Sequence, residues 1–128
     1  MNVASFTSRN VLVRKKVKSV SLLATIAGQV VFRPKTNESY ILQAAFVKNR
    51  TITGTVTTAP HTKLTNGTTD TVADVAQVTT ASTRQRLAVT GNVTIDNSNP
   101  LTLVVGTAQV GGTVFLVDLE LFLLRVSD

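Results

Sequence analysis

The C-terminal segment TVFLVDLELFLLRV (residues 113–126) is apolar at almost every position, and it constrains the fold more than any other part of the chain. In a strand, successive side chains point to opposite faces. One face would carry Phe115, Val117, Leu119, Leu121 and Leu123, and the other Val114, Leu116, Asp118, Glu120, Phe122 and Leu124. The first face predicts a sandwich core. The second predicts a subunit interface, because soluble monomers rarely expose such an apolar patch.

The composition favours an all-β protein of one domain. The 128 residues are 43% apolar and 16% charged, which is typical of a globular chain with a substantial core. The chain is rich in Thr and Val, whose branched side chains suit a pleated surface better than a helix. It has no cysteine, which excludes a disulfide framework, a thiolate nucleophile and a cysteine-based zinc site.

Turn signals divide the chain into short strands. Strands are predicted at 11–24, 28–34, 40–50, 51–60, 84–95, 101–110 and 113–126. Residues 70–78 fit either a short helix or a strand. Asn66–Asp70 predicts a turn, Gly54 a bulge or a close approach, and Gly111–Gly112 a tight hairpin turn that joins the last two strands.

These elements predict a single-domain antiparallel β-sandwich of jelly-roll type with an extended basic N-terminal arm. Residues 1–24 would form the arm and the first strand, and residues 25–128 the sandwich. The predicted core consists of Val30, Phe32, Leu42, Phe46, Val56, Leu87, Val89, Leu103, Val105, Phe115, Val117, Leu119 and Leu121.

Positive charge is concentrated in the first 50 residues, which hold nine basic residues and one acid, Glu38. The densest part is the basic arm, with Arg9, Arg14, Lys15, Lys16 and Lys18. This arm is either a solvated strand edge, which lysines protect from aggregation, or a docking segment for an acidic protein surface. Nucleic acid is a less favoured partner, because Phe6 is the only aromatic residue nearby and no recognition helix is indicated.

No set of residues predicts catalysis, a metal site or a cofactor. His61 is the only histidine and is expected in an exposed loop without an oriented nucleophile. Asp118 and Glu120 could be a solvated strip, an interfacial pair facing Arg84, Arg86 or Arg125 of a neighbour, or glycosidase-like carboxylates. A glycosidase would need an aromatic sugar cleft, and the chain has no Trp and one Tyr. We therefore expect no enzyme.

No membrane association is expected, because the longest apolar run, Thr113–Leu124, is too short and too charged to span a bilayer. The N-terminal sequence MNVASFTSRNVLVRKK has no apolar core of signal-peptide length. We therefore expect no targeting segment.

The layout from Thr36 to Val126 resembles the small jelly-roll cement or decoration proteins of tailed bacteriophages. The resemblance is carried by TNESYILQAAFVKNRTITGTVTTAP, KLTNGTTDTVADVA and NPLTLVVGTAQVGGTVFLVDLELFLL. It implies homotrimers on the capsid exterior that bridge subunits of the major capsid protein and stabilise the head. The basic arm would then be the capsid-binding segment.

Two other functions are compatible with the sequence. One is a receptor-binding or fibre-tip module of a virion that recognises a host glycan, and the other is a small hydrolase. Aromatic residues in loops would favour the glycan-binding module, and the chain offers almost none.

Overall fold

The computed structural model describes residues 12–127, and within this range it contains strands and no helix. None of the described residues forms a helix long and apolar enough to cross a membrane. The strands are β1 (Leu12–Ser21), β2 (Ile26–Phe32), β3 (Ser39–Thr58), β4 (His61–Thr65), β5 (Asp70–Ala76), β6 (Arg84–Leu87), β7 (Thr94–Asp96), β8 (Leu101–Thr107) and β9 (Val110–Ser127).

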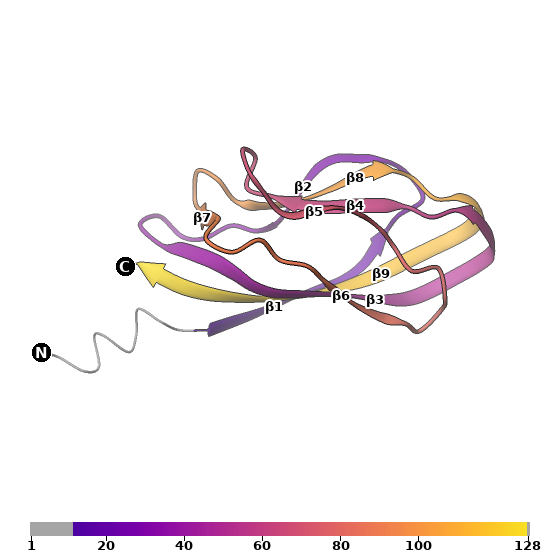
Figure 1. Cartoon of the computed structure of the whole chain (residues 1–128), viewed down its shortest axis with the longest axis horizontal. Coiled ribbons are helices and arrows are strands. Elements are labelled where there is room, and N and C mark those ends of the chain that lie inside the picture. The colour runs from indigo at the N-terminus through magenta and orange to yellow at the C-terminus, as the bar shows by residue number, and fades with distance from the viewer. Residues whose placement is uncertain (1–11, 128) are drawn as a thin grey trace, which may run out of the picture.

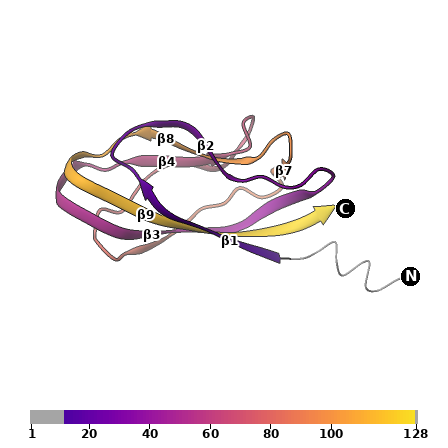
Figure 2. The same cartoon turned by 180° about the vertical axis from the view of Figure 1, so that it is seen from behind.

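Two antiparallel sheets pack face to face, as Figure 1 shows and as Figure 2 shows from behind. Sheet A has the order β1-β9-β3-β6, and β7 also pairs with β3; sheet B has the order β2-β8-β4-β5. The chain crosses from one sheet to the other after most strands, and β4–β5 is a hairpin within sheet B. This strand order is that of a jelly roll, so the predicted all-β sandwich is confirmed.

The alternation predicted for β9 is confirmed, because the five side chains expected on its inner face are buried in the core. Phe115, Val117, Leu119, Leu121 and Leu123 are all at most 2% exposed. Leu42, Leu87, Leu103 and Val105 are also buried as predicted. The core further contains Leu22, Leu64, Ile95 and Leu101, which the sequence reasoning did not select.

Two core predictions are wrong. Val30 is 46% exposed on β2. Phe46 lies on the outer face of sheet A, because the pairing of β3 with β9 shifts register between Leu42 and Ala44. This bulge turns Ala45 and Val47 inward and Phe46 outward. The other predicted residues, Phe32, Val56 and Val89, are partly buried and pack against the core.

The predicted hairpin at Gly111–Gly112 is also wrong, because β8 and β9 belong to different sheets. The chain leaves sheet B after Thr107, and both glycines lie inside β9. Gly112 pairs with Gly54 of β3 at a register shift, and Gly54 has a φ of 88°. Gly54 is therefore the predicted bulge and close approach. Gln109 fixes this crossing, since its side-chain amide donates to Gly112 O at 2.8 Å and its side-chain oxygen accepts from Gly112 N at 2.9 Å.

The remaining segments differ from the expectations mainly in where strands begin and end. Residues 70–76 are strand β5, so the helical alternative is wrong. Residues 40–60, predicted as two strands, form the single strand β3 as far as Thr58. Residues 84–95, predicted as one strand, divide into β6 and β7 around a turn that contains Asn92 at a φ of 64°. The Asn66 turn is confirmed, because the Asn66 side-chain oxygen accepts from Thr68 N and Thr69 N.

Candidate functional site

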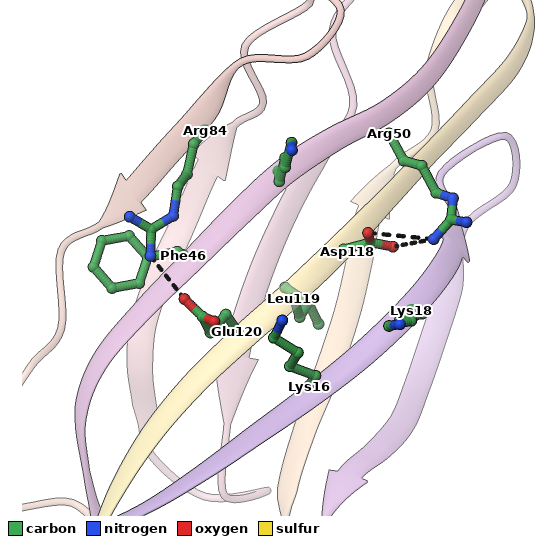
Figure 3. Close-up of a pocket in the computed structure, with 9 residues that line it drawn as sticks. Lys16, Lys18, Phe46, Arg50, Arg84, Asp118, Leu119 and Glu120 are labelled. Atoms are coloured by element: carbon green, nitrogen blue, oxygen red, sulfur yellow. Dashed lines mark hydrogen bonds and ion pairs between the residues drawn. The ribbon is translucent and has the colours of Figure 1, made fainter.

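Charged side chains from four neighbouring strands meet on the outer face of sheet A. We call this set the basic face: Arg14, Lys16 and Lys18 of β1, Lys48 and Arg50 of β3, Arg84 and Arg86 of β6, and Asp118 and Glu120 of β9. Seven cations thus surround two carboxylates. The charges alternate with inward-pointing residues along each strand, and the sheet order places β9 between β1 and β3. Figure 3 shows Asp118 and Glu120 along the middle of this arrangement.

Glu120 lies between two arginines, one from the neighbouring strand β1 and one from β6, on the far side of β3. Arg14 Nε donates to Glu120 Oε2 at 2.7 Å, and Arg84 Nη2 donates to Glu120 Oε1 at 2.7 Å. The Glu120 side chain is 17% exposed, whereas both arginines are about half exposed. The hydrogen bond from Arg14, joined by that from Arg84, lowers the pKa of the Glu120 carboxyl below its usual range. Glu120 is therefore charged at neutral pH and connects β1 to β6 across the sheet.

Asp118 fixes the other half of the basic face. The backbone N–H of Ser19 donates to Asp118 Oδ1 at 2.9 Å, and Arg50 Nη1 lies 3.4 Å from Asp118 Oδ2. Ser19 has a φ of 59°, and the pairing of β1 with β9 shifts register between Val17 and Val20. Asp118 therefore satisfies a backbone donor that this bulge removes from the ladder, and it also holds the Arg50 guanidinium over β9.

Phe46 forms the apolar part of the basic face, on the β6 side of Glu120. The Arg84 guanidinium lies 3.8 Å from the ring centroid of Phe46. Phe122 packs edge-on against the same ring at 6.0 Å between centroids. Arg84 is thus held both by cation–π attraction and by its ion pair with Glu120. Figure 3 shows it stacked on the ring, with its ion pair directed toward β9.

A buried asparagine on β3 positions the strand that carries Arg84. Asn49 is 2% exposed, and its Nδ2 donates to Val78 O at 2.6 Å and to Thr80 O at 2.8 Å. Its backbone N–H donates to Thr83 O, and its carbonyl oxygen accepts from Ser82 N. These bonds fix the segment that leads into β6.

The basic face contains a pocket of about 240 Å³. Its lining includes three lysines, Lys16, Lys18 and Lys48, together with Arg50 and Arg84. Arg50 and Arg84 pair with the β9 carboxylates, whereas the three lysines have no ion pair within residues 12–127. The pocket therefore presents unneutralised ammonium groups beside fixed guanidinium groups, which suits an anionic ligand.

Only some residues of the predicted basic arm lie in this site. Arg14, Lys16 and Lys18 lie on the basic face, because alternate residues of a strand share one side. Lys15 is exposed and pairs with the inward-facing Leu121, so it points to the other side of β1. Arg9 lies outside the described residues. The sequence analysis did not assign Lys48, Arg50, Arg84 and Arg86 to the binding surface, although their spacing of two residues on predicted strands was a usable signal.

The predicted interface row of β9 forms the outer face of sheet A. Val114, Leu116, Asp118, Glu120, Phe122 and Leu124 are all intermediate in exposure. Of the three arginines considered as partners from a neighbouring subunit, Arg84 pairs with Glu120 of its own chain. Arg125 lies 3.4 Å from Glu38, and Arg86 lies 5.8 Å from the Phe46 ring centroid. The charge of both carboxylates is thus compensated within one chain.

The only histidine of the chain lies beside one acidic residue, and the described residues include no cluster of metal-ligating side chains. His61 begins β4 and lies 2.9 Å from Asp74 Oδ2, with both side chains substantially exposed. Within residues 12–127, no three His, Cys, Asp or Glu side chains are grouped so that they could hold a metal ion.

Comparison with known proteins supports the fold. No family model matches the chain, and no curated protein matches it. Among solved structures, the fold is similar to that of a chain in the capsid asymmetric unit of cyanophage Pam1, with a TM-score of 0.62 and 13% sequence identity. The match covers 90% of this chain and 85% of that chain. At this identity, the similarity shows a shared fold across nearly the whole sandwich.

Proposed function

We propose that this chain is a structural protein of a phage virion, without enzymatic activity, that acts as a capsid cement or decoration protein. Trimers of the chain bind the outside of the head and stabilise contacts between subunits of the major capsid protein. The observation that carries the proposal is the jelly roll shared with a chain of a phage capsid over 90% of the present sequence. The basic face supports the proposal, because an exposed surface with an excess of positive charge favours association with an acidic protein surface.

The trimer is proposed to form through the apolar ends of the outer β9 row. Leu124 pairs with Leu12 on one side and with Ile41 on the other, and Leu12 is 58% exposed. Phe122 lies next along this row and continues the apolar surface toward the basic face. Burial of this patch against another copy would remove apolar area from water.

Sedimentation of the purified protein tests the trimer. The expected species has three times the 13.6 kDa mass of the chain. Leu124→Asp should shift it toward monomer, whereas Val30→Asp, at an exposed apolar position of sheet B, should not. A monomeric parent protein, or equal effects of the two substitutions, would contradict the proposed contact.

Binding to empty heads tests the function. The protein is mixed with heads assembled from the major capsid protein of the phage that encodes it, and co-sedimentation and cryo-electron microscopy locate any bound copies. We expect saturable binding on the outer surface and a higher temperature for head disruption. A protein that neither binds heads nor delays their disruption refutes the cement function.

Recognition of a host glycan is the alternative. Sugar-binding sites commonly use exposed Trp or Tyr, but the chain has no Trp, and its single tyrosine, Tyr40, is 6% exposed. A specific signal on a glycan array, together with no binding to heads, would favour the receptor-binding function over the cement function.

A further inference from the structure

The three lysines of the basic face are arranged on both sides of β9. Lys16 of β1 pairs in register with Glu120, and Lys48 of β3 pairs with Asp118. Because β9 separates β1 from β3, their backbones lie two strand spacings apart, which is about 10 Å. Lys18 lines the same pocket one alternation further along β1. Two ammonium groups on the β1 side and one on the β3 side therefore flank the central carboxylates.

This spacing matches an extended polypeptide with acidic side chains at alternate positions. Side chains at positions i and i+2 of a strand lie about 6.5–7 Å apart on one face. Two such carboxylates could reach Lys16 and Lys18 on β1, or Lys16 and Lys48 across β9. Arg50 and Arg84 add donors whose positions are already fixed, since each has an ion pair to β9 and uses only part of its five N–H groups for it.

Two features favour an acidic peptide over a nucleic acid. Single-stranded nucleic acid is held by stacking of bases on exposed aromatic rings, but the one aromatic ring in the pocket, Phe46, is covered by Arg84 at 3.8 Å. Asp118 and Glu120 also place negative charge along the middle of the site. A continuous phosphate backbone would approach these carboxylates, whereas separate acidic side chains can reach the lysines on either side.

We propose that the basic face is a docking site for an extended, carboxylate-bearing segment of a partner protein, with Lys16, Lys18 and Lys48 as the main contacts. If the proposed cement function holds, this segment belongs to the major capsid protein, so that part of the inference rests on the proposed function. The contact surface is then a composite of β1, β3 and β6, rather than the linear basic arm.

The test compares two variants of equal net charge. Lys16→Gln/Lys48→Gln removes one ammonium group from each side of β9. Lys35→Gln/Lys63→Gln removes two lysines that do not line the pocket. The probes are poly-L-glutamate and an oligothymidylate of similar charge, measured by fluorescence anisotropy at low and high salt. Empty heads are tested in parallel by co-sedimentation.

We expect the first variant to bind poly-L-glutamate at least about tenfold more weakly at low salt, since two favourable ion contacts are lost. The second variant should bind within about twofold of the parent at about 0.15 M salt, where a Debye length of about 8 Å largely screens charges remote from the site. Equal losses in both variants would show that overall charge, and not this face, attracts the probe. Tighter binding of oligothymidylate than of poly-L-glutamate would also overturn the proposal.

The co-sedimentation measurement with empty heads distinguishes this proposal from the cement function. If heads bind the parent and the Lys16→Gln/Lys48→Gln variant equally, the cement function stands and the docking site is refuted. If heads bind neither, the cement function fails, and the poly-L-glutamate measurements still decide whether the basic face recognises acidic segments.

Discussion

Removal of the Asn49 side chain should destabilise the sandwich and release the strand that carries Arg84. Asn49 is 2% exposed, and its amide group bonds to the carbonyl oxygens of Val78 and Thr80 at 2.6 and 2.8 Å. Asn49→Ala removes both bonds and leaves two partly buried acceptors without this donor. Each lost bond typically costs about 0.5–1.5 kcal/mol, and unsatisfied acceptors add to this, so we expect a loss of about 2–3 kcal/mol.

Thermal unfolding followed by circular dichroism measures this loss. For a chain of this size, each kcal/mol corresponds to a shift of about 4 °C in Tm, so the variant should unfold about 10 °C below the parent. Both proteins must be compared at one concentration, because self-association would itself raise the Tm. Gln43→Ala is the matched control on the same strand: Gln43 is exposed, and a surface substitution should change stability by no more than about 0.5 kcal/mol.

Hydrogen exchange provides a second and more local measurement. Because Asn49 holds the segment that leads into β6, the amides of Arg84–Leu87 should exchange faster in Asn49→Ala, and by more than the amides in the middle of β9. A shift of less than about 3 °C in Tm, with unchanged protection of β6, would refute this reasoning. The segment would then be held by its backbone bonds to β3 alone.

Three further predictions concern the basic face and the crossing between the sheets. Because its pKa is lowered in the folded state, the Glu120 carboxylate contributes stability that is present above about pH 4.3 and is lost as the pH falls through the folded-state pKa. Glu120→Gln should therefore reduce the fall in Tm at acid pH when Tm is measured against pH. An unchanged fall in Tm at acid pH would contradict this. Gly111→Ala should lower the free energy of unfolding in urea by about 2–4 kcal/mol, because φ is 99° there and the added Cβ would lie 2.4 Å from a backbone oxygen of β3. Gly67→Ala, at a φ of 94° in open space, should cost about 1 kcal/mol. Equal costs would show that the backbone conformation alone, and not the close approach, determines the loss. Lys16→Gln should weaken binding to heads more than Lys15→Gln does, because the two side chains point to opposite faces of β1; equal effects in co-sedimentation would support a linear basic arm instead.

The sequence could predict the parts of the fold in which a period of two runs without interruption. In β9 the alternation is unbroken from Phe115 to Leu123, and each predicted core residue is buried. In β3 the same reasoning fails after Leu42, because a bulge at Gln43 exchanges the two faces and nothing in the residue types marks it. Phe46 was therefore assigned to the core, although it belongs to the candidate site.

The predicted hairpin failed for a different reason. Two glycines between two apolar strands are typical of a tight turn, and this reasoning uses only local conformation. In the structure, the positive φ of Gly111 serves a close approach of β9 to Thr55 and Thr57 of β3 instead. Whether consecutive strands pair or separate into two sheets depends on contacts distant in sequence, which local turn signals do not encode. The same limit explains why the basic residues of β3 and β6 were not joined to the arm.

The carboxylates of β9 acquire a definite role once the sheet order is known. A carboxylate pair in an apolar strand needs cations near it, and β1, β3 and β6 supply them from the same chain. Asp118 and Glu120 therefore compensate part of the charge of seven cations and hold three arginines in fixed positions. The three lysines and Arg86 pair with neither carboxylate, so most of the remaining positive charge is on them. A partner's carboxylates lose their charge near pH 4, so the proposed contact should weaken in acid through the partner, even though the basic face itself becomes more positive as Glu120 is protonated.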